Sequence, residues 1–266
     1  MKTDPSIVVM RGGGDLGTGA ALRLQRAGWR VLITELAQPL MIRRAVAFGS
    51  AIYEGSIKVE DTIAQRIEQV DETDRIWSLD RIPVIVDADR LIGIQLKPTA
   101  MIDAIMAKHN TGTRLTDAPI VVALGPGFVA GVDCHAVVET NRGHNLGRVY
   151  YRGSAETDTG VPGQIGGENY RRVLRAPTSG AFHAERKIGE VVKAGEVIGY
   201  VGSVPLMAQI DGVLRGVLAD GLSIAGGTKV ADIDPRGNVR HCFSVSDKAW
   251  AVGGGVLEAV MYLARL

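Results

Sequence analysis

Three glycines near the amino terminus have the spacing that phosphate binding uses. Gly12, Gly14 and Gly17 follow the pattern G-x-G-x-x-G. They stand between an apolar stretch at 7–11 and a run at 16–27 whose apolar residues recur at helical spacing. In that setting the first glycine permits a tight turn, the second lets the backbone approach a diphosphate, and the third lets helix and strand pack closely. These residues predict a nucleotide phosphate bound at a helix amino terminus.

Three charged residues bear on which ligand the loop would take. Glu35 closes the next apolar stretch and is placed to accept hydrogen bonds from a ribose diol, which disfavours the 2′-phosphate of NADP. Asp15 opposes an anionic ligand by its charge, whereas Arg11 could contact a phosphate. A diphosphate joined to a ribose describes NAD, and it equally describes a dinucleotide form of the molybdenum cofactor. The residues leave that choice open, together with the alternative of an empty loop.

A second glycine turn and a polar segment offer further contacts. Gly125 and Gly127 follow the apolar stretch 118–124, and ligands of parallel sheets bind beyond the carboxyl ends of strands. This turn could therefore face the first glycine loop, or it could be a simple turn. The segment 139–145 gathers Asn141, Arg142 and His144, which could hold an anionic ligand or form the tip of a solvated hairpin.

Metal and nucleophile chemistry are weakly supported. Cys134–His135 and His241–Cys242 are adjacent pairs, and adjacent residues of a strand point to opposite faces. With no C-x-x-C spacing in the chain, we expect no metal site. The same geometry argues against Cys134 as a nucleophile activated by His135.

Composition excludes several classes of function. The formal net charge is +1, with acids and bases interspersed, so the chain lacks the basic stripe of a nucleic-acid-binding protein. No apolar stretch approaches the roughly 18 residues that span a bilayer. The first residues lack the apolar run of a secretory signal. We therefore expect a cytoplasmic protein without a membrane or nucleic-acid partner, and one that could form a homo-oligomer.

Strand and helix patterns alternate in the first half of the chain and predict an α/β fold. Apolar stretches at 7–11, 29–35 and 118–124 are typical of buried strands, while helical spacing predicts helices at 58–70 and 97–109. The predicted fold class is a Rossmann-like parallel sheet domain, a small all-β barrel-sandwich hybrid domain and a carboxyl-terminal helix. The predicted boundaries are a nucleotide-binding domain at 1–152, a linker at 153–169, the barrel-sandwich domain at 170–236 and a helix at 237–266 that packs back on the first domain.

The second half carries one glycine-punctuated pattern twice. Gly189–Val201 and Gly221–Ile233 align without a gap at an offset of 32 residues. The stretch 176–235 resembles the barrel-sandwich hybrid of biotinyl and lipoyl carrier domains. Those carriers present a modified lysine on the hairpin between their halves, but the segment 202–209 contains none. We therefore expect no attached biotin or lipoate, and a docking or ligand-shielding module instead.

Three segments together resemble the YqeB family: "RGGGDLGTGAALRLQRAGWRVLITELAQPLMIRRAVAFGSAIYEG", "DAPIVVALGPGFVAGVDCHAVVETNRGHNLGRV" and "TGVPG". That family is associated with selenium-dependent molybdenum hydroxylase systems, and its Rossmann-like half is comparable to XdhC-type maturation factors. The resemblance implies an accessory or maturation factor whose partner is a molybdenum hydroxylase or another maturation factor. Its nucleotide-bearing ligand would lie across Gly12–Gly17 and Glu35.

Two alternatives remain at this point. One is an NAD-dependent oxidoreductase, for which His135 or His144 would be the acid–base group. The other is a non-catalytic scaffold with a vacant Rossmann pocket.

Overall fold

The structure, a computed structural model, describes residues 6–87 and 91–265. The chain divides into two compact units. The first unit contains the residues up to Pro39, then Ala47–Thr159, and those from Val245 on; the second contains Leu40–Val46 and Gly160–Ser244. This division places 40–46 and 237–244 with the second unit. The boundaries expected from the sequence instead assigned 40–46 to the first domain and 237–244 to the carboxyl-terminal helix. Each unit has its own hydrophobic core.

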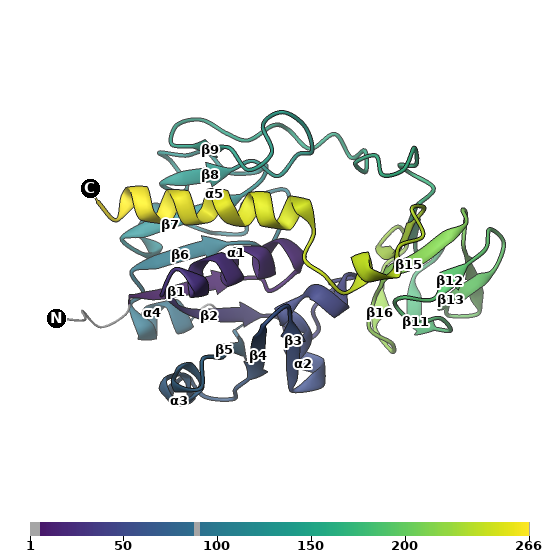
Figure 1. Ribbon diagram of the computed structural model, residues 1–266, viewed down its shortest axis with the longest axis horizontal. Coiled ribbons are helices and arrows are strands. Elements are labelled where there is room, and N and C mark those ends of the chain that lie inside the picture. Colours follow the sequence, from purple (N-terminus) through teal and green to yellow (C-terminus); the bar gives the residue numbers. More distant parts are fainter. Residues whose placement is uncertain (1–5, 88–90, 266) are drawn as a thin grey trace. The chain divides into compact units, whose positions relative to one another are not determined.

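A single mixed sheet forms the centre of the first unit (Figure 1). Within the described residues it has nine strands in the order β3-β4-β5-β2-β1-β6-β7-β8-β9. The strands from β4 to β8 pair in parallel, while β3 pairs with β4 and β9 with β8 in antiparallel fashion. The strands are β1 (Ile7–Arg11), β2 (Arg30–Glu35), β3 (Ser56–Val59), β4 (Thr62–Arg66), β5 (Ile82–Val86), β6 (Ala100–Asp103), β7 (Ile120–Leu124), β8 (Ala136–Val138) and β9 (Val149–Tyr150).

Two helices, α1 (Asp15–Arg26) and α5 (Asp247–Leu263), pack against each other on one face of this sheet (Figure 1). Their close approach depends on glycine, because a Cβ at Gly19 would lie 2.4 Å from the Ala249 carbonyl oxygen. The short helices are α2 (Ala51–Glu54), α3 (Thr73–Ser78) and α4 (Ile92–Leu96). In the described part of the chain, no helix is long and apolar enough to cross a membrane.

Two helices expected from apolar spacing are strands in the structure. The segment 58–70 contains the end of β3 and all of β4, which form a hairpin whose turn holds Glu60 at a φ of +55°. The segment 97–109 contains β6, which is buried along its whole length between β1 and β7. Tertiary pairing overrides the local pattern in both places, because short apolar runs suit a buried strand as well as a helix.

The second unit consists of two four-stranded antiparallel sheets among the described residues, in the orders β10-β17-β15-β12 and β14-β13-β11-β16. The 32-residue offset of the sequence relates β11 to β15, β12 to β16 and β13 to β17. The strands are β10 (Val173–Arg175), β11 (Gly180–Ala184), β12 (Val191–Val192), β13 (Val197–Val201), β14 (Val204–Met207), β15 (Gly212–Val217), β16 (Ser223–Ile224) and β17 (Lys229–Asp234).

The predicted fold class is therefore corrected in both halves. The first unit has a mixed sheet instead of the expected Rossmann-like parallel sheet, because hairpins add antiparallel strands at both of its edges. For the second unit, we replace the expected biotinyl/lipoyl-like barrel-sandwich hybrid with the description that the strand order gives, two four-stranded antiparallel sheets.

Candidate functional site

The first glycine loop connects β1 to α1, and its glycines are required mainly by close backbone contacts. Gly12 has a φ of +95°, and a Cβ there would lie 2.8 Å from the Ala104 carbonyl oxygen. A Cβ at Gly17 would lie 2.4 Å from the Gly12 carbonyl oxygen. Gly14, the residue before α1, has open space around it, and Asp15 is the first residue of that helix. Only Gly14 of the three motif glycines would accept a side chain without a clash.

The Glu35 carboxylate lies on the loop where a diphosphate was expected. Its Oε1 accepts a hydrogen bond from the Gly13 N–H at 2.7 Å, and its Oε2 accepts one from the Leu36 N–H at 3.1 Å. The Gly13 carbonyl accepts from the Gly49 N–H at 2.8 Å. Burial raises the pKa of Glu35, and the two N–H donors offset part of that rise. A diphosphate at this loop would have to displace Glu35 from the Gly13 amide.

β1, β6 and β7 are neighbouring parallel strands. The second glycine turn, which follows β7, therefore lies at the same end of the sheet as the first glycine loop, which follows β1. A Cβ at Gly127 would lie 2.6 Å from the Cα of His109, and one at Gly125 would lie 2.5 Å from Thr140 Oγ1. The segment 104–109, which follows β6, therefore contacts Gly12 near one end and Gly127 at the other. It fills the space next to both turns.

Three other residues singled out in the sequence, Asn141, Arg142 and His135, have structural partners. Asn141 donates to Glu156 at 2.7 Å, and Arg142 forms two hydrogen bonds with Asp247 at 2.8 and 3.0 Å. His135 Nδ1 accepts from the Val121 N–H at 3.0 Å, and burial lowers its pKa. Within the described residues, the His144 side chain forms no hydrogen bond or ion pair.

The two cysteines are buried, and no group of metal-ligating side chains occurs among the described residues. Burial and the neighbouring Asp133 raise the pKa of Cys134 to about 12, so its thiol is not a ready nucleophile. Burial also raises the pKa of Cys242.

A cavity of about 890 Å³ opens on the sheet face that carries Val9 and Arg11, and we call it the sheet-face pocket. Strand register explains its floor: Val9 pairs with Met101 of β6, and Arg11 pairs with Thr34 of β2. Alternate residues of a strand share a face, so these side chains form two rows on one side of the sheet. The remaining lining residues come from the end of β5, from the region of α4 and from the segment that precedes β7: Asp87, Gly93, Lys97, Pro98, Thr99, Gly112, Arg114, Thr116, Asp117, Ala118 and Pro119.

Arg11 is the buried cation of the pocket, and neighbouring polar groups fix its position. It lies 3.4 Å from Asp103 Oδ2 and donates to Thr113 Oγ1 at 2.5 Å, while that hydroxyl donates to Asp103 at 2.6 Å. Arg11 is 8% exposed and Asp103 is 1% exposed. A buried carboxylate beside a guanidinium holds it in one orientation, so Arg11 is pre-organised at the edge of the cavity.

Lys97 and Arg114 add positive charge from the two walls. Both are exposed, and neither side chain forms an ion pair within the described residues. The two carboxylates that line the pocket accept backbone hydrogen bonds: Asp87 from Leu91 at 2.9 Å, and Asp117 from Arg114 at 3.0 Å. Lys97 has a φ of +45°, which is uncommon for a residue with a side chain. Such conformations concentrate at functional sites.

Sequence reasoning missed this pocket. Arg11 was noted only as a possible phosphate contact for the glycine loop, and Lys97 was placed in a helix. The available sequence signal was indirect. Pro98 and Pro119 each stand shortly before a strand, and both line the cavity.

Comparison with known proteins gives one close relative. No protein-family model matches the chain. The chain is 49% identical over 257 residues to the uncharacterized protein YqeB of Escherichia coli, an alignment that covers 97% of this chain and 48% of the relative. The chain thus spans about half the length of the curated relative it matches.

The solved structures that it resembles are distant. They include an aspartoacylase family protein from Mesorhizobium loti, with 13% identity, 87% of this chain and 85% of that chain covered, and a TM-score of 0.29. A succinylglutamate desuccinylase/aspartoacylase from Rhodobacter sphaeroides has 15% identity, 86% and 85% coverage and a TM-score of 0.27. The product-bound ectoine utilization protein EutE from Ruegeria pomeroyi has 11% identity, 86% and 85% coverage and a TM-score of 0.26. Similarity at this level assigns neither their fold nor their activity to this chain.

The functions predicted from the sequence are corrected here. They were a molybdenum hydroxylase maturation factor with a nucleotide at the glycine loop, an NAD-dependent oxidoreductase, and a scaffold with a vacant Rossmann pocket. The loop on which all three depend is neither open nor vacant, because Glu35 occupies the Gly13 amide. His135, one nominated acid–base group, is engaged by a backbone N–H. What the comparisons do show is kinship over almost the whole sequence, and the chain belongs to the YqeB family.

Proposed function

We propose that the first unit binds an anionic small molecule in the sheet-face pocket. The observation that carries this proposal is the cavity itself, whose volume of about 890 Å³ falls in the range of roughly 300–1,000 Å³ typical of ligand sites. Its floor is partly apolar, and its edge and walls carry three cations. This combination suits an organic molecule with a compact apolar part and at least one acidic group.

The lining residues offer a ligand three kinds of interaction: apolar contact, positive charge and hydrogen bonds. Val9 and Met101 offer apolar surface from the floor, where burial of a ligand gains free energy at about 25 cal/mol per Å². Lys97 and Arg114 offer charge that no acidic side chain of the described residues already pairs. Thr34, Thr99 and Thr116 also line the cavity, and a threonine hydroxyl can donate to or accept from polar groups.

Calorimetric titration of the full chain against a set of anionic compounds tests the proposal. The set contains sugar phosphates, mononucleotides and dicarboxylates, together with NAD and a molybdenum-cofactor dinucleotide, the two cofactors expected from the glycine loop. Lys97→Gln and Arg114→Gln should each weaken the binding of an active compound by about tenfold, which corresponds to roughly 1.4 kcal/mol.

Lys187→Gln is the matched control. Lys187 is an exposed lysine of the second unit, so the variant removes the same charge away from the pocket. Binding that is weakened equally by all three variants would indicate a general charge effect and contradict the proposal. The expected partners, a molybdenum hydroxylase or another maturation factor, stay predictions that titration with purified proteins would test.

A further inference from the structure

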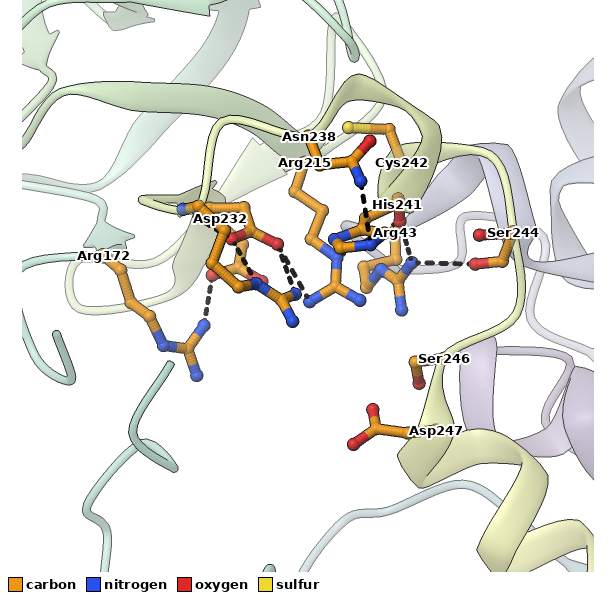
Figure 2. A network of polar contacts seen from close by, with 12 residues as sticks. Arg43, Arg172, Arg215, Asp232, Asn238, His241, Cys242, Ser244, Ser246 and Asp247 are labelled. Atoms are coloured by element: carbon orange, nitrogen blue, oxygen red, sulfur yellow. Dashed lines mark hydrogen bonds and ion pairs between the residues drawn. The ribbon is translucent and has the colours of Figure 1, made fainter. Parts of the chain in front are cut away.

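A cluster of oppositely charged side chains lies on one side of the second unit, and we call it the arginine cluster: Arg43, Arg172, Arg215, Arg236, Asp232 and Asp234. Figure 2 shows the guanidinium groups of Arg43, Arg172 and Arg215 directed to the same side of the strands. These three arginines are only 8%, 7% and 5% exposed, respectively. A cation removed from water is costly unless an anion or a full set of hydrogen bonds compensates it.

The two carboxylates of the cluster are already engaged by other arginines. Asp232 accepts a short hydrogen bond from Arg172, whose other nitrogens donate to the Gly163 carbonyl at 3.1 and 2.9 Å. Both oxygens of Asp234 accept from Arg236, at 2.9 and 2.6 Å. Two parallel hydrogen bonds between a guanidinium and a carboxylate are the strongest arrangement such a pair can form. Neither carboxylate is therefore available in its best geometry for Arg215.

Arg215 is the cation that this arrangement leaves poorly compensated. Its nearest carboxylate oxygen is Asp234 Oδ2, 3.6 Å from the guanidinium, which is too long for a hydrogen bond. Its Nε donates to the His241 carbonyl at 3.4 Å, which is also long. Within the described residues, the Arg215 side chain forms no other hydrogen bond or ion pair. A buried guanidinium with several N–H donors thus makes only two weak contacts.

The surroundings of Arg215 add positive charge and donor capacity. Arg43 donates to the same His241 carbonyl at 3.0 Å and to the Ser244 carbonyl at 3.4 Å, so the His241 carbonyl is shared by two guanidinium groups. Burial lowers the pKa of Arg215, the charge of Arg43 lowers it further, and the carboxylates of Asp232 and Asp234 act in the opposite direction. The Nδ1 atom of His241 is buried and has no hydrogen-bond partner among the described residues.

We propose that Arg215, together with Arg43, binds an oxyanion of the phosphate type on the second unit. The planar fork of a guanidinium matches two oxygens of such an anion, and two guanidiniums side by side can hold it from two directions. The anion would add negative charge and would supply the short hydrogen bonds that Arg215 lacks. The proposal goes beyond the function proposed above, because it concerns a different unit and none of the residues of the sheet-face pocket.

Titration of the full chain with inorganic phosphate, at constant ionic strength in chloride buffer, tests the proposal. We expect saturable binding at a single site. Arg215→Gln should weaken it by at least about tenfold, because a charge-assisted fork is lost. Arg215→Lys keeps the charge without the fork, and should retain part of the affinity. The width of the phosphorus-31 resonance of added phosphate provides a second readout that does not depend on protein stability.

Arg175→Gln is the matched control within the same unit. Arg175 is exposed, and among the described residues its side chain donates only to the Gly227 carbonyl, so this variant should bind phosphate as the wild type does. The combined Lys97→Gln and Arg114→Gln variant should also bind phosphate normally, which separates this proposal from the sheet-face pocket. Phosphate that gives no more signal than chloride would overturn the proposal. Equal affinities of the wild type and Arg215→Gln for phosphate would also overturn it. If circular dichroism shows that Arg215→Gln is unfolded, Arg215→Lys takes its place in this comparison.

Discussion

At the scale of single residues, Glu35 decides how the glycine loop is to be understood. The pattern of the loop is that of a phosphate site, yet a carboxylate of the protein itself accepts the Gly13 N–H. An amide at a helix amino terminus favours a negative group, and here the chain supplies that group from the end of β2. The loop is thus stabilised internally: Gly12 packs closely against the Ala104 backbone, and Gly17 packs against Gly12.

The raised pKa of Glu35 predicts a pH-dependent cost that Glu35→Gln would remove. A carboxyl group whose pKa is higher in the folded than in the unfolded protein stabilises the fold below the unfolded value of 4.5. That contribution is lost as the pH rises from 4.5 through the raised folded pKa. The melting temperature of the wild type should therefore fall relative to that of Glu35→Gln across this window. Thermal denaturation of both proteins over a pH series measures the difference, and a difference that stays constant with pH would refute this explanation.

Sequence reasoning reached part of the candidate site and missed the rest for a physical reason. The glycine loop and Glu35 are neighbours in a local motif, so their proximity was visible. In the buried set of Arg11, Asp103 and Thr113, Asp103 lies 92 positions and Thr113 lies 102 positions from Arg11 along the chain. Only the pairing of β1 with β6 brings them together. Because 97–109 was expected to be a helix, that pairing and the pocket beside it could not be foreseen.

At the scale of elements, the contact between α1 and α5 depends on individual glycines. A Cβ at Gly253 would lie 2.5 Å from the Gly19 carbonyl oxygen, whereas no atom lies within 4 Å of a Cβ at Gly254. The three consecutive glycines of α5 are therefore not equivalent, although the sequence pattern treats them alike. The sequence predicted the helix and a close partner for it, but could not say which glycines form the contact.

Two alanine substitutions one residue apart test this contact. Gly253→Ala should lower the free energy of unfolding by about 1–3 kcal/mol, because the backbones of the two helices must move apart. Gly254→Ala should raise it by about 1 kcal/mol, because alanine favours the helix and meets no neighbour. Urea denaturation measures both, and similar effects of the two substitutions would show that the helices do not approach as closely as described.

Continuous apolar stretches were predicted correctly as strands, whereas a hairpin that depends on strand pairing was predicted as a helix. The stretches 7–11, 29–35 and 118–124 are confirmed as β1, β2 and β7, apart from one or two residues at their starts. In 58–70, Val59, Ile63 and Ile67 fit helical spacing, but the turn at Glu60 lets the chain reverse and pair with itself. Apolar spacing alone does not distinguish these outcomes in short runs.

At the scale of the whole molecule, the two units have separate hydrophobic cores, so we expect each unit to have its own free energy of unfolding. One core cluster of the second unit includes Phe182 and Leu214, and the clusters of the first unit include Val9 and Val121. Compact units with their own cores tend to unfold as units.

Scanning calorimetry of the full chain should therefore resolve two transitions. Phosphate should raise the melting temperature of one of them, and a ligand of the sheet-face pocket should raise that of the other, since each ligand stabilises the unit that binds it. Lys97→Gln should reduce only the shift caused by the ligand of the sheet-face pocket, and Arg215→Gln only the shift caused by phosphate. A single transition that both ligands shift equally would contradict independent binding by two units.

Hydrogen exchange of the full chain, with and without the tightest-binding anionic compound, tests the central claim about the sheet-face pocket most directly. We expect slower exchange in 92–101 and 112–119, the segments that form the two walls of the cavity. The peptides that contain Gly12–Gly17 and Gly125–Gly127 should exchange at an unchanged rate. Slower exchange confined to those glycine turns, or in no segment of the first unit, would contradict a ligand site on the sheet face.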